Sequence, residues 1–342
     1  MLATAKVDAT LSDGAEAAGS GERASVRGPR SYELEPGDVL DGLQIVRVLA
    51  RCGMGSVFKA HERKTGATVV LKVPHMRFES DVVFYARFQR EERIGLRLRH
   101  PGIARVLPAP EKSRPYIVFE YVEGSSLWHL LKSEGRLPVD RVAEIGRKIC
   151  AALVYMHGEG VIHRDLKLEN VILDGHGAPR IVDFGIALDH RDRRLTWGRF
   201  SNRLGTPEYM APEQFRGRRG DARVDIYALG AMLYELASGA TPFATGSVAS
   251  LMRSKLHDHP KPLTTAAPDV DPAFASVVMR ALARNPDERF SSAAEMLGAL
   301  ADPAGMTAVV AAARPRLAPR MLRWAWLCAA LIGAAWIATR FG

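Results

Sequence analysis

The sequence predicts an α+β chain of two lobes, a small strand-rich part followed by a larger helix-rich part, with a single apolar helix near the C-terminus. Strand-like segments with β-branched and aromatic residues dominate the first part, and helical periods dominate from about Asp140 onward. The third observation is an uncharged apolar run, Trp324–Thr339. A length of 342 residues suits about two structural units plus tails.

Composition and charge exclude several classes of protein. Hydrophobic residues make up 47% and charged residues 25%, so the chain is neither wholly disordered, nor collagen-like, nor a polytopic membrane protein. The 47 Lys and Arg against 38 Asp and Glu leave a net charge of +9, which alone does not choose between nucleic acid, membrane and acidic ligands. The three cysteines form no CxxC, so neither a disulfide framework nor a zinc site is expected.

Residues 1–36 are expected to be a flexible tail, because their Ala-, Gly- and Ser-rich start has no lasting apolar period and no signal-peptide core. Strands are predicted at Leu43–Leu49, Val69–Val73 and Tyr116–Val122. A helix that ends near Gly158 is indicated by the apolar face of Val142, Ile145, Ile149, Leu153 and Met156.

The C-terminal region predicts a membrane anchor. A basic Pro/Ala-rich linker, 303–320, leads to the run Trp324–Thr339, which as a helix is about 24 Å long. Neighbouring apolar residues can extend it toward the roughly 30 Å hydrocarbon core if the flanking arginines snorkel, giving a transmembrane helix over 321–341. The alternative, a buried terminal helix of a soluble domain, usually has polar residues on one face, and this run has none.

Flanking charges predict the orientation of that helix. The arginines near its ends are Arg314, Arg316, Arg320 and Arg323 before the run and Arg340 after it. The positive-inside rule then keeps the main domain cytoplasmic, on a single-pass helix in the inner (plasma) membrane. Ala325, Ala329 and Gly333 form a small-residue strip that would let two helices approach as a homodimer, although an Ala-rich run produces such strips by chance.

Two motifs carry the strongest chemical signal. The run HRDLKLEN at 163–170 is followed by DFG at 183–185, with a short predicted hairpin, Val171–Leu173 and Arg180–Val182, between them. The pair resembles the catalytic and metal-binding loops of protein kinases. The resemblance spans about residues 40–302.

Three further sequence motifs resemble most closely those of the eukaryotic-type serine/threonine kinases of bacteria. These are GMG at 53–55, GTPEYMAPE at 205–213 and NPDERF at 285–290. The resemblance implies a two-lobed protein kinase fold over 37–302, with an N-lobe over about 37–122 and a C-lobe over about 123–302.

Phosphoryl transfer also asks for these residue types on chemical grounds. It needs positioned phosphates, cations that neutralise them and a carboxylate near the attacking hydroxyl. Asp165 is the candidate base and Lys167 the cation for the γ-phosphate. Asn170 and Asp183 are hard oxygen ligands suited to Mg²⁺, with Mn²⁺ as a substitute. Alone, an Asp near a Lys and an Asn is usually a solvated loop, but coincidence does not explain both motifs.

Lys72 lies in an apolar predicted strand, where an isolated lysine is usually an edge residue that reaches water. The following helix favours another reading. One apolar face is formed by Phe84, Phe88, Gly95 and Leu98, and Glu91 is the only carboxylate on it. A buried carboxylate requires a cation, so Glu91 is predicted to pair with Lys72. Glu92, about 100° round the helix, is the alternative carboxylate.

The glycine-rich loop departs from the family pattern. Ala50 and Cys52 replace its first two glycines, while Gly53 and Gly55 remain. A Cβ costs about 1–2 kcal/mol where φ must be positive and less elsewhere, so ATP binding is expected to weaken by up to about tenfold. Cys52 is either a redox handle over the phosphates or, more simply, a tolerated small residue.

The resemblance also assigns the adenine pocket. It implies that Phe119 precedes the hinge, that the Glu120 carbonyl and the Val122 amide bind adenine, and that apolar side chains enclose the ring. The remaining residues expected to touch ATP are Leu49, Val57, Val70 and Leu173.

Activation and support residues follow from the same resemblance. Arg164 is expected to receive a phosphate from the activation loop, whose candidate phosphosites are Thr196 and Ser201. The arginines of that loop could bind phosphate or an acidic partner, and a solvated charge run is the default. Residues expected to support the site are His163 in the catalytic loop, Thr206 near the catalytic Asp and Lys, Glu213 paired with Arg289, and Asp225 as an anchor of the catalytic loop.

The sequence thus predicts a membrane-tethered serine/threonine protein kinase that uses Mg-ATP, acts on protein substrates and activates itself by phosphorylation. No nucleic-acid partner is expected. The rival is a catalytically weak pseudokinase that acts as a scaffold, and it rests on Ala50 and Cys52.

Overall fold

The computed structural model of the chain describes residues 34–52, 55–76, 81–109, 111–183, 188–189, 207–217, 220–244 and 246–305. The chain divides into the units Met1–Leu34 and Glu35–Gly342, and every helix and strand below belongs to the second. The predicted membrane helix, 321–341, and nearly all of the predicted tail and linker lie outside the described residues. Within the described ranges, no helix is both long enough and apolar enough to cross a lipid bilayer.

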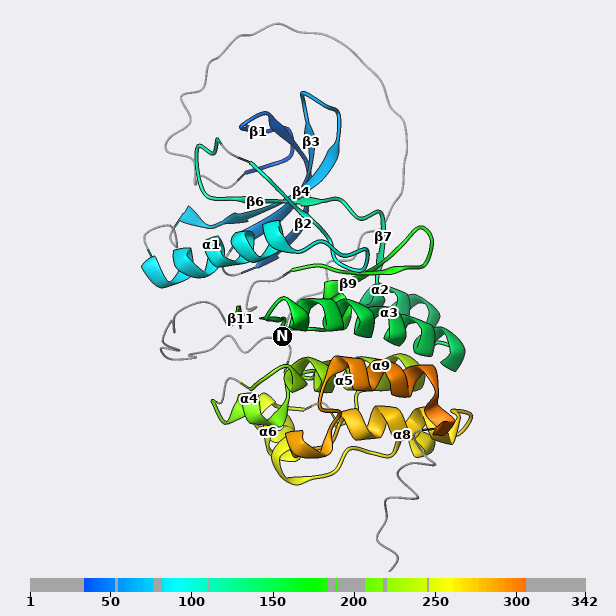
Figure 1. Cartoon of the computed structure of the whole chain (residues 1–342). Helices are drawn as coiled ribbons and strands as arrows, with labels where there is room; N and C mark the ends of the chain where they lie inside the picture. Colours follow the sequence, from blue (N-terminus) through cyan, green and yellow to red (C-terminus); the bar gives the residue numbers. More distant parts are fainter. Residues whose placement is uncertain are drawn as a thin grey trace, which may run out of the picture. The chain divides into compact units, whose positions relative to one another are not determined.

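The first part of the second unit is a six-stranded sheet (Figure 1). Its strand order is β1-β2-β3-β4-β6-β5, and every neighbouring pair is antiparallel. The strands are β1 Val39–Leu40, β2 Leu43–Cys52, β3 Gly55–Glu62, β4 Thr68–Pro74, β5 Val106–Leu107 and β6 Ile117–Glu120. This sheet confirms the three predicted strands, β2, β4 and β6, and adds β1, β3 and β5, which the sequence analysis did not predict.

Alternation along β4 sorts its side chains onto two faces. Val69, Leu71 and Val73 are buried, whereas Val70 and Lys72 lie on the other face and are partly exposed. The ladder places Lys72 opposite Val57 of β3 and Ile117 of β6. A ligand can therefore reach the Lys72 side chain from the partly exposed face of the sheet.

Helix α1, Val82–Arg97, packs beside the sheet next to β5. Its predicted apolar face is present, because Phe88 and Leu98 are buried and the rings of Phe84 and Phe88 stack at 6.3 Å. Glu91 lies on this same face and is only 3% exposed. Helix packing thus places a carboxylate in the interior beside the sheet.

The second part is helical, and its core lies between α3 and its neighbours α5 and α9 (Figure 1). Helix α3 ends at Gly158, as predicted. Gly230 lets α5 and α8 approach closely, since a Cβ there would lie 2.7 Å from the Ala281 Cβ. The helices are α2 Leu127–Glu134, α3 Val139–Gly158, α4 Pro212–Phe215, α5 Arg223–Ser238, α6 Val248–His257, α7 Leu263–Ala266, α8 Pro272–Ala281 and α9 Ala293–Ala301, with 3-10 turns η2 Leu168–Asn170 and η3 Pro286–Glu288.

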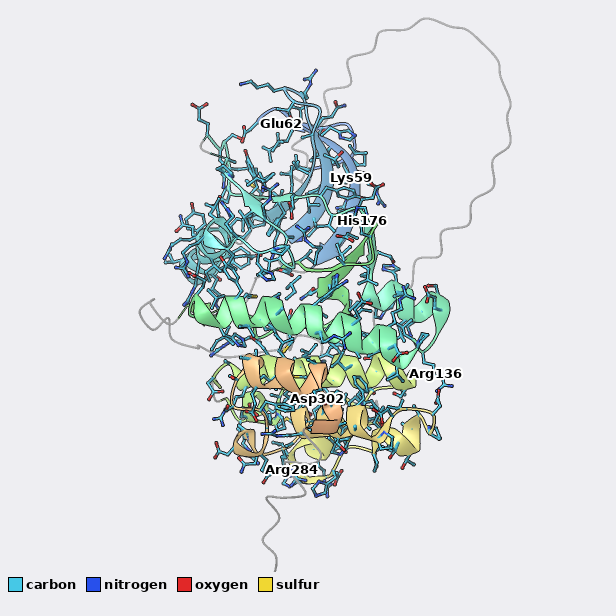
Figure 2. All side chains as sticks on the ribbon, turned by 45° about the vertical axis from the view of Figure 1, so that its right-hand side comes forward. Lys59, Glu62, Arg136, His176, Arg284 and Asp302 are labelled. Atoms are coloured by element: carbon cyan, nitrogen blue, oxygen red, sulfur yellow. The ribbon has the colours of Figure 1, made fainter. Side chains whose placement is uncertain are left out.

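Two small sheets frame the loop between them. Strands β7 Gly124–Ser126, β9 Val171–Asp174 and β10 Pro179–Ile181 form one, and β8 Val161–Ile162 pairs with β11 Leu188–Asp189 in the other. The β9–β10 hairpin confirms the predicted one. Its turn, marked by His176 in Figure 2, is closed by the Asp174 carboxylate, which accepts the backbone N–H groups of His176 and Ala178.

Candidate active site

Lys72 is the centre of a three-member charged cluster. Its Nζ donates to Oε1 and Oε2 of Glu91 at 2.7 and 2.9 Å, so the predicted pair is present. The alternative carboxylate, Glu92, pairs instead with Lys112. The same Nζ donates to Oδ1 of Asp183 at 2.7 Å, which brings the aspartate of the 183–185 motif to the lysine.

Asp183 adopts a backbone conformation that is uncommon outside glycine. Its φ is +69°, in the left-handed region that costs free energy for a residue with a Cβ. Burial disfavours the charged Lys72 ammonium, but the carboxylates of Asp183 and Glu91 outweigh it and raise the pKa of Lys72. Burial raises the pKa of Glu91 to about 7, against the opposing effect of Lys72. The cluster therefore combines one ammonium, which can bind an anion such as phosphate, with two carboxylates, which can bind a cation.

The loop between β8 and β9 brings the predicted catalytic residues together. The Lys167 Nζ lies 3.3 Å from the Asp165 Oδ2. The Asn170 Nδ2 donates to the Asp165 backbone carbonyl at 2.8 Å and is buried. The turn η2 and the start of β9 therefore fix the side chains of Asp165, Lys167 and Asn170 relative to one another.

The donor set suits a hard divalent cation. The Asn170 Nδ2 is committed to a carbonyl, so its Oδ1 is the amide atom that can bind a metal. The Asp183 carboxylate supplies charged oxygens from the following motif, and it already faces a cation, the Lys72 ammonium. Oxygen ligands of these two kinds are those that Mg²⁺ prefers, so the residues present fit the implied metal.

Asp225 holds the catalytic loop from inside the helical part. It is fully buried near the start of α5 and accepts the backbone N–H groups of His163 at 2.9 Å and Arg164 at 2.7 Å. The His157 Nε2 lies 2.9 Å from its Oδ2. Burial would raise the pKa of Asp225, but His157 and the other donors hold it below its ordinary value. The predicted anchoring by Asp225 is present, and Arg164 within it adopts a positive φ of 69°.

Arg164 and the segment after 206 meet beside this anchor. An Arg164 guanidinium N–H donates to the Gly220 carbonyl at 3.1 Å, and the Arg164 carbonyl accepts from the Gln214 side chain at 3.3 Å. Thr196 and Ser201, the candidate phosphosites whose phosphate Arg164 is expected to bind, lie outside the described residues, and so does Thr206. Binding of a phosphorylated residue by Arg164 therefore stays a prediction.

The predicted Glu213–Arg289 pair is also present and is bidentate. Both Arg289 NH groups donate to the Glu213 carboxylate, at 2.7 and 2.8 Å. The guanidinium also donates to the carbonyls of Ala283, Arg223 and Arg284. This pair joins α4 to the turn η3 and supports the segment that precedes α4.

The residues expected around adenine lie along neighbouring strands. Ala50 faces Val57 across the β2–β3 ladder, Val57 faces Lys72, and Val70 faces Phe119. Leu173 is on β9, and Leu49 is one of the exposed apolar residues of the sheet. Glu120 ends β6 ahead of Val122, and its carboxylate is bound by Arg105 and Arg180.

Ala50 and Cys52, the part of the glycine-rich loop that the structure describes up to residue 52, do not show the positive φ that would make a side chain costly there. Strand β2 continues through Cys52, and Ala50 is not among the described residues with positive φ. Gly55 has a steric role, because a Cβ there would lie 2.5 Å from the Val73 carbonyl oxygen of β4. Gly53 lies outside the described residues. At Ala50 the smaller of the two expected costs therefore applies.

The structure adds supporting residues that the sequence analysis missed. Lys255 of α6 is 1% exposed and donates to the backbone carbonyls of Glu208 and Met210, the latter at 2.9 Å. Lys255 follows the buried Leu251 by one helical turn, so a lysine on an apolar face was the available signal. Gln214 and His157 gave no pattern of their own, because their roles depend on contacts distant in sequence.

Comparison with known proteins places this geometry in a family. A family model described as "Protein kinase domain" matches residues 43–299. A protein named "Probable serine/threonine-protein kinase" from Streptomyces coelicolor is 37% identical over 270 residues, which cover 78% of this chain and 38% of the relative. The serine/threonine-protein kinase PknB of Mycolicibacterium smegmatis is 35% identical over 266 residues, covering 76% of this chain and 43% of PknB.

A third relative gives the same picture. The serine/threonine-protein kinase pkn3 of Myxococcus xanthus is 39% identical over 260 residues, which cover 73% of this chain and 48% of pkn3. This chain thus spans less than half the length of each of these relatives. With the two-lobed arrangement and the clusters around Lys72 and Asp165, the match over residues 43–299 shows that the chain belongs to the protein kinase family, of the eukaryotic-like serine/threonine type found in bacteria.

Proposed function

We propose that this chain is a serine/threonine protein kinase that transfers the γ-phosphoryl group of ATP to protein hydroxyls. One observation carries the proposal. The Lys72–Asp183 contact of 2.7 Å joins the sheet to the catalytic segment, where Asp165, Lys167 and Asn170 converge. Phosphoryl transfer needs this combination of cations, oxygen ligands and a carboxylate. The relatives named serine/threonine-protein kinases support the choice of acceptor.

The residues divide the reaction between them. Lys72, held by Glu91, would bind the α- and β-phosphates of ATP. Asp165 would accept the proton of the substrate hydroxyl while the hydroxyl oxygen bonds to the γ-phosphorus. The bond from the γ-phosphorus to the bridging oxygen breaks, ADP leaves, and Lys167, 3.3 Å from Asp165, stabilises the negative charge of the transferred group.

The metal-binding residues are Asn170 and Asp183. Mg²⁺ would neutralise charge on the phosphates when bound, and Mn²⁺ is a substitute of similar ligand preference. Asp183 would contribute a carboxylate that Lys72 already orients, and Asn170 would contribute its amide oxygen, held in place because the Nδ2 of the same amide donates to the Asp165 carbonyl. The chain's own contribution is to hold the oxygen atoms of Asn170 and Asp183 in place before the metal binds.

The pseudokinase alternative loses part of its basis. It rested on side chains at two glycine positions, and Ala50 lies in β2, next to a register shift of the β2–β3 ladder, without a positive φ. The six residues that phosphoryl transfer asks for are all present: Lys72, Glu91, Asp165, Lys167, Asn170 and Asp183. We therefore favour an active enzyme.

Regulation and location belong to the same proposal. Phosphorylation of Thr196 or Ser201 would activate the enzyme, with Arg164 among the groups that receive the phosphate. The helix over 321–341 would tether it to the inner membrane with the catalytic domain in the cytoplasm, and paired helices would form a homodimer.

Transfer of label from γ-labelled ATP in the presence of magnesium tests the activity. The wild-type chain should label itself or a Ser/Thr-containing protein acceptor. Asp165→Asn should label at a rate lower by at least about a hundredfold, because it removes the proton acceptor. Wild-type protein that binds Mg-ATP but transfers no label would disprove the proposed activity.

A further inference from the structure

Helix α1 carries two adjacent carboxylates, and each has its own lysine. Glu91 bonds to Lys72 of β4, and Glu92 bonds to Lys112 of the segment between β5 and β6. The second pair is partly buried, with side chains 17% exposed for Lys112 and 23% for Glu92. The helix is therefore held by ion pairs to two different segments.

Lys112 is itself fixed by its own segment. Its Nζ donates to the Tyr116 carbonyl at 2.8 Å and lies 5.2 Å from the centre of the Tyr116 ring. Tyr116 is almost completely buried, and its hydroxyl bonds to the Asp41 carboxylate in the turn between β1 and β2. The same carboxylate accepts the backbone N–H of Ser113 at 2.9 Å. Lys112 therefore contacts Glu92 from an anchored position.

The two pairs together constrain rotation of the helix. Successive residues of an α-helix point about 100° apart, so Glu91 and Glu92 are held from different directions. The buried apolar face and the Lys72 contact already limit rotation of α1, and the Lys112 contact adds a constraint from a second direction. A turn of α1 would move Glu91 away from Lys72, because the contact of 2.7 Å depends on its direction.

We propose that Lys112 is a positioning residue for the nucleotide site: its ion pair with Glu92 fixes the rotation of α1 and so holds Glu91 against Lys72. The inference rests on the proposed function, since it assigns Lys72 to the phosphates of ATP. It adds a structural element, the segment that carries Lys112, to the groups that control the site.

A plain surface ion pair is the simplest other explanation, and the chain contains a matched example. Lys148 and Glu144 pair at 2.7 Å on α3, with side chains 44% and 55% exposed. Such exposed pairs contribute little. If Lys112–Glu92 were of this kind, its removal would leave the nucleotide site unchanged, as removal of Lys148–Glu144 should.

The test measures the Kd of Mg-ATP by calorimetry on the full chain, without any need for turnover. Lys112→Met and Glu92→Gln should each raise the Kd by about threefold to tenfold, more than the loss of an exposed ion pair and less than the loss of a fully buried one. The double variant should bind no more weakly than the weaker single variant, because both changes remove one interaction. Lys112→Arg should stay within about twofold of wild type, and so should Lys148→Met.

A second background separates positioning from general loss of stability. In Glu91→Gln protein the Lys72 contact is already weakened, so adding Lys112→Met should change the Kd by less than about twofold. An undiminished effect of Lys112→Met in that background would overturn the proposal, as would a wild-type Kd in both single variants. Absence of label transfer by wild-type protein would instead count against the proposed function, and the binding measurement would still decide the role of Lys112.

Discussion

Lys72 is the residue whose side chain joins the other charged groups of the site. It bonds to Glu91 and Asp183 with distances of 2.7 Å to each carboxylate. Two carboxylates on one cation leave excess negative charge, which a bound divalent metal ion would neutralise. Removing the cation leaves a buried carboxylate without its partner, and such a change affects both binding and rate.

Lys72→Met should therefore lower kcat/KM for ATP by at least about a hundredfold while unfolding remains cooperative. Asp183→Ala should have an effect of similar size, because it removes a metal ligand. Steady-state labelling and a urea unfolding curve measure the two properties on the same preparation. A variant that unfolds cooperatively and keeps a wild-type kcat/KM would show that the site is wrongly assigned.

Ala50 gives a residue-level prediction of the opposite kind. Its position in β2 without positive φ means that a glycine has no strain to relieve. Ala50→Gly should change the KM for ATP by less than about twofold and lower stability by about 0.5–1 kcal/mol, the cost of a glycine within a strand. A large fall in KM would show that the methyl group obstructs the phosphates, as the family pattern first suggested.

Single residues also show which contacts of the site could be predicted from the sequence and which could not. The Lys72–Glu91 pair was predictable, because a carboxylate on an apolar helical face requires a cation. Asp183 bonding to the same lysine was not, since it depends on how the loop after β10 meets β4. Lys255 escaped notice because nothing local indicates which backbone carbonyls a buried lysine will find.

At the scale of elements, α6 is tied to the segment before α4 through Lys255. The lysine lies near the rings of Phe215 and Tyr227, at 6.0 and 5.2 Å, and bonds to the Glu208 and Met210 carbonyls. Burial lowers the pKa of Lys255 to about 7, and the nearby Glu208 only partly opposes this. An element joined through a group of this kind has a pH-dependent stability.

The sign of that dependence follows from the two states. An unfolded lysine keeps its proton up to its ordinary pKa of 10.5, whereas folded Lys255 loses it above about 7. Between these values the unfolded chain binds more protons, so this group's contribution to stability rises with pH, by at most about 1.4 kcal/mol per pH unit. Lys255→Met should remove this slope, whereas Lys148→Met, at an exposed position, should retain it. Urea unfolding at pH 7.5 and 9.5 measures the difference, and equal slopes in wild type and Lys255→Met would exclude the assignment.

Elements also differ in how readily the sequence revealed them. The end of helix α3 was predicted near Gly158, where the structure has it, because its apolar period is unbroken up to a glycine. Strand β3 was missed, since its mixed segment GSVFKAHE contains few strongly strand-forming residues. Its place in the sheet is fixed by pairing with β2 and β4 on both sides, and such tertiary pairing is not encoded locally.

At the scale of the whole chain, the described elements end with α9 at Ala301, next to α3. The Arg147 side chain donates to the Leu300 carbonyl at 3.4 Å and ties this last helix back to α3. The helix predicted over 321–341 is therefore not required to complete the described core. The catalytic domain and the predicted membrane helix can therefore be tested separately.

A chain ending at Ala313 should accordingly remain active in label transfer and stay in the supernatant after centrifugation. The full chain should stay in the membrane fraction through high-salt and carbonate washes, because an apolar span resists both, whereas arginines bound to anionic lipid are screened by salt. Leu331→Arg places a charge in the middle of the run, at a cost of about 2.5–3.5 kcal/mol, and should release part of the protein. Replacing Arg314, Arg316 and Arg320 with glutamine is the matched control and should leave the full chain in the membrane fraction. Release of the unmodified full chain by salt alone would show that charge, and not an apolar span, holds it there.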